Sequence, residues 1–332
     1  MACDWRKCSA LLLQIFSFTL LGVGPVSQSM AAGYASAESE VPQPDDAQLS
    51  GPASVGLQND DASENHRATR PFVSDRIQAV RDAVENPFSL ASHKENYVLP
   101  IAYRDLSEQM WVTESRYGME QVYPAEVQFQ LSLQVPIWSG IWGEDSFLSF
   151  AYTNRSFWQA YARSGPFRET NHEVELLATR ASDWQVFGFQ SVVSQAGISH
   201  QSNGRSGAYS RGWNRIFVDV TFEKGGYFVG LKPWYRLSAD SNAGRGPDLD
   251  AHFGNFELSG GYRSGGYSSS IKLRNNLSSE NYGAVELRWK FPISNRVRGF
   301  VKYFDGYGES LIDYSVRVRT LGVGFELAPG FF

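Results

Sequence analysis

Three residues in one short stretch, His200, Ser202 and Asn214, could together carry out nucleophilic catalysis. A serine hydroxyl becomes a nucleophile when a neighbouring base takes its proton, and an imidazole base needs a third group to fix its tautomer. An asparagine carbonyl can accept the imidazole N–H and so orient the ring without adding charge. Serine, asparagine and glycine are equally typical of a simple polar turn. The spacing alone leaves both interpretations open.

The strands expected on either side of this stretch would bring the three side chains together. In an extended strand His200 and Ser202 are two residues apart, so their side chains emerge on the same face. Asn214 begins the next expected strand. It lies beside the other two if the two strands form an antiparallel hairpin.

Alternating apolar and polar residues predict strands throughout the chain after about Asn96. In the run 126–135, "EVQFQLSLQV", valine, phenylalanine and leucine occupy one face and mainly glutamine the other. This period of two is that of a strand with one apolar and one polar face. About twelve such segments occur between Asn96 and Leu327, with centres near Pro100, Leu131, Phe150, Leu176, Phe187, Val218, Val229, Phe256, Ile271, Glu286, Val301 and Gly322.

These strands favour a barrel that spans a membrane. The mature chain has no unbroken apolar run long enough for a spanning helix, and a closed barrel is the other structure that pairs all its backbone groups in lipid. Tyrosine and tryptophan gather near the strand ends, as they do in outer-membrane barrels. We therefore predict an all-β fold, a twelve-stranded antiparallel transmembrane β-barrel over residues 96–332. A soluble β-sandwich or barrel is the alternative.

The first 37 residues have the pattern of a secretory signal peptide. Two basic residues precede the apolar run 10–23, and small residues follow it. Cleavage is expected after Ala37, with Ala32 as the alternative site, and an uncleaved anchor helix is the competing interpretation. Both cysteines, Cys3 and Cys8, lie in this segment, so the mature chain cannot form disulfides.

Residues 38–70 form an acidic leader, and residues 71–95 a segment with a short helix. The leader carries seven acidic residues and very few large apolar groups, which predicts disorder. Of the net charge of −5, residues 1–37 contribute +1 and residues 38–66 contribute −7, so residues 67–332 carry +1 and nothing suggests a nucleic-acid partner. Helical spacing of apolar residues in Ser74–Glu85 predicts an amphipathic helix packed across one end of the barrel.

The string "HQSNGRSGAYSRGWNR" closely resembles the active-site segment of the outer-membrane phospholipase A family. The strings "FQLSLQVPIW", "SGPFRETN", "KPWY" and "GYGESLIDY" also resemble that family, in the same order, over most of residues 126–332. The resemblance implies a twelve-stranded barrel in the outer membrane of a Gram-negative cell. It also implies a calcium-dependent lipase that hydrolyses acyl esters of phospholipids and lysophospholipids, at the A1 and A2 positions, and works as a homodimer.

Carried over by this resemblance, the nucleophile is Ser202, the general base His200 and the orienting amide Asn214. The backbone N–H of Gly204 resembles the family's oxyanion donor. Glycine suits this place because the substrate must approach the main chain closely. The three side chains would face outward, into the outer leaflet, where the acyl chains are.

The resemblance also implies a Ca²⁺ site shared between two subunits. Its ligands fall on the carbonyl of Arg205, on Ser210, and on Ser164, which would reach the site from the partner. Calcium prefers oxygen ligands, so carbonyls and hydroxyls suit it. One departure is Gly207, where family members often carry an acidic residue. This puts in doubt any second calcium site that would use that position.

Two other functions stay open on the residues alone. A non-enzymatic barrel, either a narrow porin or an adhesin, would have the same strands. An esterase for other acyl lipids would have the same triad, because the triad indicates ester chemistry and not the head group. The remaining histidines, His66, His93, His172 and His252, show no metal-binding spacing and are interpreted as surface or loop residues.

Overall fold

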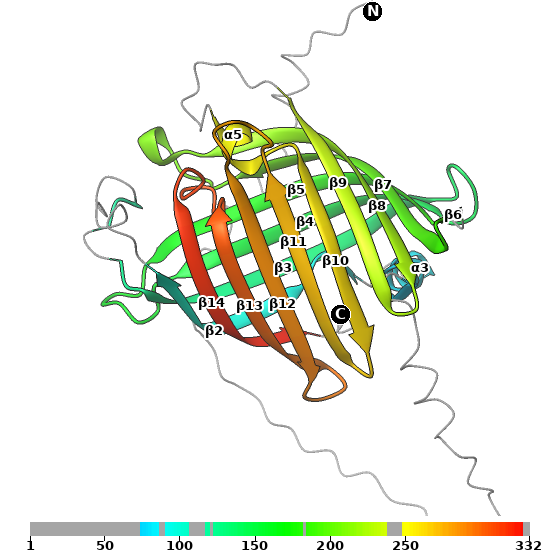
Figure 1. Ribbon diagram of the computed structural model, residues 1–332, viewed down its shortest axis with the longest axis horizontal. Helices are drawn as coiled ribbons and strands as arrows, with labels where there is room; N and C mark the ends of the chain where they lie inside the picture. Colours follow the sequence, from blue (N-terminus) through cyan, green and yellow to red (C-terminus); the bar gives the residue numbers. More distant parts are fainter. Residues whose placement is uncertain are drawn as a thin grey trace, which may run out of the picture. The chain divides into compact units, whose positions relative to one another are not determined.

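The computed structural model describes residues 74–85, 90–105, 117–119, 122–181, 184–237 and 248–327 (Figure 1). The expected signal peptide and acidic leader lie outside these residues and stay predictions. The elements are α3 (Ser74–Glu85), β1 (Ala91–Ser92), β2 (Asn96–Asp105), β3 (Ala125–Ser139), β4 (Ser146–Trp158), β5 (Phe167–Ala181), β6 (Gln185–Val186), β7 (Phe189–Ser202), η2 (Gly207–Tyr209), β8 (Gly212–Lys224), β9 (Tyr227–Leu237), α5 (Leu249–Phe253), β10 (Phe256–Ser264), β11 (Tyr267–Asn275), β12 (Gly283–Pro292), β13 (Val297–Tyr307) and β14 (Arg317–Leu327).

The long strands form one closed antiparallel sheet. Each pairs with the next along the chain, and β14 pairs with β2 to close the barrel. In the described part of the chain, β1 and β6 are two-residue strands, which leaves twelve long ones. The predicted fold is therefore confirmed. One predicted strand centre is wrong, because Phe187 lies in the tight turn between β6 and β7, with a positive φ of 51° and its side chain 96% exposed.

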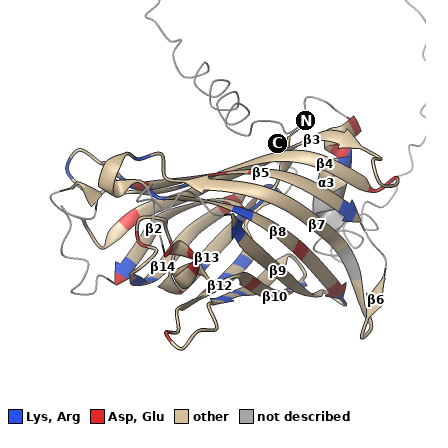
Figure 2. Cartoon of the chain, turned by 90° about the horizontal axis from the view of Figure 1, so that it is seen from above, with Lys and Arg blue, Asp and Glu red and all other residues tan. Residues whose placement is uncertain are grey.

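The barrel is polar inside and apolar outside. In β3 the outward side chains of Leu131 and Val135 are exposed, whereas Gln128, Ser132 and Gln134 are buried. A strand in lipid has this inverted pattern, since its outer face contacts hydrocarbon and its inner face a polar interior. Figure 2 shows charged residues along the strands as well as at their ends.

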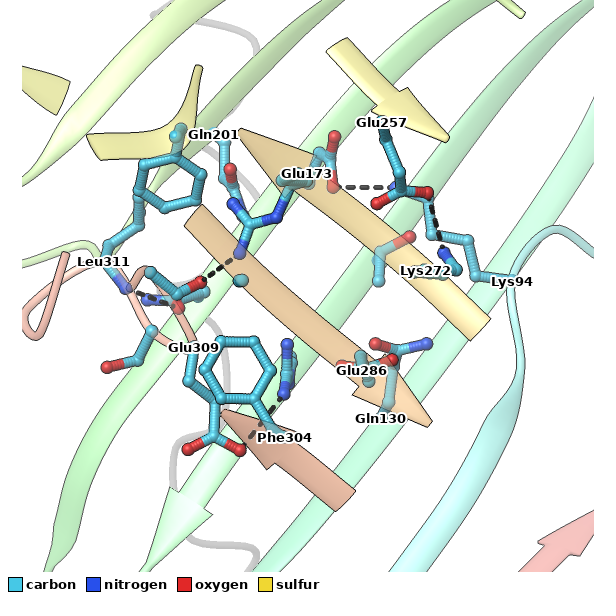
Figure 3. Close-up of a pocket in the computed structure, with 18 of the residues that line it drawn as sticks. Lys94, Gln130, Glu173, Gln201, Glu257, Lys272, Glu286, Phe304, Glu309 and Leu311 are labelled. Atoms are coloured by element: carbon cyan, nitrogen blue, oxygen red, sulfur yellow. Dashed lines mark hydrogen bonds and ion pairs between the residues drawn. The ribbon is translucent and has the colours of Figure 1, made fainter. Parts of the chain in front are cut away.

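Ion pairs fill the interior around a cavity of about 190 Å³. Figure 3 shows charged side chains from opposite sides of the barrel meeting there. Glu173 lies 2.7 Å from Lys94 Nζ and 2.8 Å from an Arg215 nitrogen, and Lys272 lies 3.1 Å from Glu257. The inner, polar face of the strands is thus lined by charged side chains that form ion pairs with one another.

Helix α3 covers the same residues as the predicted helix and packs at one end of the barrel. Val80 and Ala83 are buried against Ala91, Phe147 and Val193. An amphipathic helix buries its apolar side and leaves its polar side in water. Neither helix in the described residues is long and apolar enough to cross a membrane.

The two ends of the barrel differ in the length of their connections. At the end with α3, the turns 225–226 and 265–266 have two residues each. At the other end, residues 106–124, 203–211, 238–255 and 308–316 form the longer connections. Outer-membrane barrels have short periplasmic turns and longer extracellular loops, so the second end is extracellular. The hairpin β7–β8 carries the candidate site to that end.

Candidate active site

The hairpin β7–β8 places His200, Ser202 and Asn214 on the outside of the barrel. The two strands pair antiparallel, with His200 opposite Asn214 and Ser202 opposite Gly212. Their neighbours on the same face, Ile198 and Ile216, are 52% and 43% exposed. The three polar side chains therefore share one lipid-facing surface. A polar set in that position is costly and indicates function.

His200 and Asn214 are joined by a hydrogen bond that fixes the imidazole. His200 Nδ1 lies 2.7 Å from Asn214 Oδ1. An amide oxygen only accepts, so Nδ1 carries the proton and the lone pair of Nε2 is left for a base. Ser202 Oγ and His200, both in the described part of the chain, form no hydrogen bond with each other. Such contacts commonly tighten only when substrate binds.

The loop 203–211 is held in shape by the side chain of Asn203. Its Oδ1 accepts the N–H of Arg211 at 2.9 Å, and its Nδ2 donates to the carbonyl of Tyr209 at 2.9 Å. Gly204 follows with a positive φ of 64°, a conformation that favours glycine. The backbone conformation thus favours glycine at this position, two residues after Ser202 in the chain.

Arg205 and Ser210 lie in this same loop, and Ser164 lies in an exposed turn between β4 and β5. The Arg205 carbonyl and the Ser210 hydroxyl accept or donate no hydrogen bond within the described residues. Carbonyl and hydroxyl oxygens are ligands that suit Ca²⁺, so these residues fit the ion. Among the described residues, no group of three or more histidine, cysteine or carboxylate side chains is placed to hold a metal ion. Ser164 has a φ of 69°, rare for a non-glycine residue.

The side chain of Arg205 fastens this loop to the barrel wall. Its guanidinium donates to the carbonyl of Tyr117 at 2.8 Å and to that of Arg168 at 2.5 Å, and its Nε lies 3.5 Å from Glu169. The side chain of Arg205 therefore holds the loop in place.

Beneath the loop lies a buried ion cluster around Asp313. This carboxylate accepts from Arg168 at 2.6 Å, Arg104 at 3.1 Å and the Tyr117 hydroxyl at 2.6 Å. Burial alone would raise the pKa of Asp313, but the two guanidinium groups lower it to about 2. Burial and the negative charge of Asp313 raise the pKa of Tyr117 to about 12. The cluster supports the site loop from inside the barrel.

Sequence reasoning missed this cluster, although two family-like strings contain parts of it. "SGPFRETN" includes Arg168, and "GYGESLIDY" includes Asp313. The interpretation of the remaining histidines as surface or loop residues was wrong for His252, which is buried within α5. His93 does lie in a connection, between β1 and β2, but it is buried there, 2.8 Å from Glu175. His172 lies within β5 on the outer surface, opposite Ser202. Inter-strand register brings His172 beside Ser202, and alternation does not encode it. His66 lies outside the described residues.

Comparisons with known proteins agree with this architecture. The family model described as "Phospholipase A1" matches residues 73–327. A phospholipase A1 of Klebsiella pneumoniae is 38% identical over 246 residues, covering 73% of this chain and 84% of that protein. The solved outer membrane phospholipase A of Escherichia coli is 35% identical, with a TM-score of 0.70 over 76% of this chain and 97% of that one.

A second similar solved structure is a dimer. It is described as the Salmonella typhi outer membrane phospholipase dimer with bound calcium, and it is 34% identical, with a TM-score of 0.70 over 76% of this chain and 98% of that one. The closed barrel, its apolar outer surface and these similarities together place the protein in the outer membrane of a Gram-negative cell. The relatives are named for phospholipase A1, an ester-hydrolysing enzyme. The chain belongs to the phospholipase A1 family.

Proposed function

We propose that this protein is a calcium-dependent phospholipase that hydrolyses acyl esters from the outer leaflet with a Ser202–His200–Asn214 triad. The observation that carries the proposal is the hydrogen bond from His200 Nδ1 to Asn214 Oδ1, on the lipid-facing side of the hairpin and next to Ser202. It gives the imidazole the tautomer that a general base requires.

The reaction follows from these positions. Ser202 Oγ attacks the ester carbonyl carbon while His200 Nε2 takes the hydroxyl proton, and the carbonyl electron pair moves onto oxygen. The Gly204 N–H donates to that oxyanion. When the tetrahedral carbon collapses, the glycerol oxygen leaves with the proton from His200. Water then attacks the acyl-serine in the same manner, and the fatty acid leaves.

The open position of the triad supports a broad choice of ester. The site lies on the outside of the barrel, so the acyl chains of a membrane lipid reach it without entering the lumen. We therefore expect hydrolysis at both the A1 and A2 positions and of lysophospholipids. Phospholipids with a distinguishable acyl chain at each position would test this, because the proportion of the two fatty acids released measures the preference directly.

Calcium fits this site through the carbonyl of Arg205 and the hydroxyl of Ser210, with Ser164 supplied by a second copy of the chain. When bound there, Ca²⁺ would supply positive charge beside the developing oxyanion. A site without carboxylates binds the ion modestly, so its completion by a second subunit would make activity depend on dimerisation. The Salmonella typhi relative, described as a calcium-bound dimer, supports this arrangement.

Replacing Ser202 with alanine tests the proposal. The Ser202→Ala protein should lose phospholipid hydrolysis while its barrel still shifts in mobility on heating. Ser206→Ala is a matched control, because Ser206 is an exposed serine of the same loop whose side chain forms no cap hydrogen bond. Full lipase activity in Ser202→Ala would overturn the assignment of the nucleophile. Full activity of the wild type after complete chelation would remove calcium from the mechanism.

A further inference from the structure

A second histidine stands beside the proposed nucleophile on the lipid-facing surface. His172 lies in β5, directly opposite Ser202 in β7, and opposite Asn154 in β4. Its side chain is half-buried and belongs to the outward set of β5, with Val174 and Leu176. Side chains directly opposite on neighbouring strands lie within contact distance. The hydrogen bonds of His172 are with Tyr152 and Asn154, and not with the residues of the triad.

Neighbours on β4 fix the tautomer of His172. Ser156 Oγ donates to Asn154 Oδ1 at 3.0 Å, which turns the amide nitrogen of Asn154 toward His172 Nδ1, 3.4 Å away. The Tyr152 hydroxyl lies 2.7 Å from the same nitrogen. An amide N–H only donates, so Nδ1 accepts and the proton of the neutral ring is on Nε2.

The Nε2 side of this ring faces the loop that carries the proposed oxyanion donor. A methyl group built on Gly204 would lie 3.8 Å from both Nε2 and Cδ2 of His172. Within the described residues, Nε2 has no hydrogen-bond partner. An N–H held in a fixed orientation at the edge of a reaction site can donate to a substrate oxygen without reorganising.

We propose that His172 Nε2–H is a second donor to the oxyanion, beside the N–H of Gly204. The proposal rests on the function given above, with Ser202 as nucleophile. As Ser202 Oγ bonds to the carbonyl carbon, the C=O electron pair moves onto oxygen, which accepts from Gly204 and from His172. No proton leaves His172. It is therefore a catalytic residue that stabilises charge, whereas His200 transfers the proton.

The two histidines thus carry opposite tautomers for opposite tasks. His200 donates from Nδ1 to Asn214 and keeps a lone pair on Nε2, as a base requires. His172 accepts at Nδ1 from Tyr152 and keeps its N–H on Nε2, as an oxyanion donor requires. In each case the orienting side chain comes from a neighbouring strand, so the barrel sets both protonation patterns.

The experiment compares His172→Phe with His172→Gln on two substrates. Phenylalanine keeps the ring shape without a donor, and the glutamine amide nitrogen can occupy the place of Nε2. One substrate is a phospholipid in mixed micelles, and the other a p-nitrophenyl acyl ester, which has no phosphate head group. We expect His172→Phe to lower kcat about 100-fold on both, with KM unchanged, as for loss of one oxyanion donor. His172→Gln should stay within about tenfold of wild type.

Each result separates this proposal from its alternatives. Wild-type kcat in His172→Phe would overturn it, and so would a loss confined to the phospholipid or to KM, which would indicate head-group binding. Heat-dependent mobility checks that the barrel is folded, and His172→Leu carries the same expectation if the phenylalanine protein does not refold. Ser202→Ala is assayed in parallel. Its inactivity together with a fully active His172→Phe rejects the second donor and leaves the proposed function standing.

Discussion

The barrel holds polar side chains in two regions that behave in opposite ways. In the lumen, carboxylates and cations such as Glu173, Lys94 and Arg215 lie within ion-pair distance of one another. On the outer surface beside the extracellular loops, His200 and His172 each use Nδ1 for a hydrogen bond with a neighbour, and their Nε2 atoms form none with the described residues. Mutual pairing stabilises a fold, whereas a partly used polar group is available to a substrate.

This difference gives a criterion for finding function in a barrel with many polar residues. Lumenal charges are numerous, yet their partners are other lumenal side chains around a cavity of about 190 Å³. The outward polar set is small and lies where lipid would favour apolar groups. Substitutions in the outer set should change catalysis at little cost in stability, and substitutions in the lumen should do the reverse.

The largest expected effect comes from removing the base. His200→Asn should lower kcat about 1,000-fold, because the serine proton then has no basic acceptor within reach. Lipid hydrolysis by the refolded protein measures this, and a denaturant titration should give an unchanged midpoint. A loss of stability as large as the loss of activity would break the proposed contrast between the two regions.

The orienting amide should matter less than the base. Asn214→Ala removes the acceptor for His200 Nδ1–H, so the ring samples both tautomers and other orientations, and kcat should fall about 10- to 100-fold. Asn214→Gln, with the same amide on a longer stem, is the comparison. If the alanine protein kept wild-type kcat, the 2.7 Å hydrogen bond would be structural and not catalytic.

The sequence predicts the strands and the three triad residues of the outer region, but not every residue that belongs to it. Alternation gives the strands, since one face of each must be apolar for lipid, and the spacing of His200, Ser202 and Asn214 needs only one hairpin. His172 is 30 residues before Ser202 and reaches it through the pairing of β5 with β7, which skips the short strand β6. A shift of this register by two residues would leave the alternation unchanged and separate the two side chains.

The ion cluster around Asp313, beneath the site loop, could not be predicted from the sequence for a related reason. Asp313, Tyr117 and Arg168 come from two loops and a strand end that are far apart in the chain. Local patterns carry no information on which loops meet over the barrel. The strand prediction at Phe187 is wrong for a local reason, because this apolar residue lies in a tight turn and not inside a strand.

Breaking a lumenal ion pair should show the reverse of the outer substitutions. Glu173→Gln removes the carboxylate from Lys94 and Arg215. The free energy of unfolding should fall by about 3 kcal/mol, the lower end for a broken buried pair, because Lys94 keeps Glu175 at 2.8 Å. Denaturant unfolding in detergent measures this loss. We expect kcat within about twofold of wild type, and a catalytic defect like that of His200→Asn would contradict the contrast.

The smallest expected effect is a pH dependence of the cluster that joins the two regions. Asp313 has a folded pKa of about 2, below its ordinary value of 3.8, so its ion pairs stabilise the fold fully above about pH 4 and are lost as the pH falls toward 2. This difference corresponds to at most about 2 kcal/mol. Asp313→Asn cannot ionise, so the stability advantage of the wild type over this variant should be full at pH 5 and shrink as the pH approaches 2. An advantage that stays constant over that range would mean that the carboxylate acts by shape and hydrogen bonding, and that its charge does not support the loop above it.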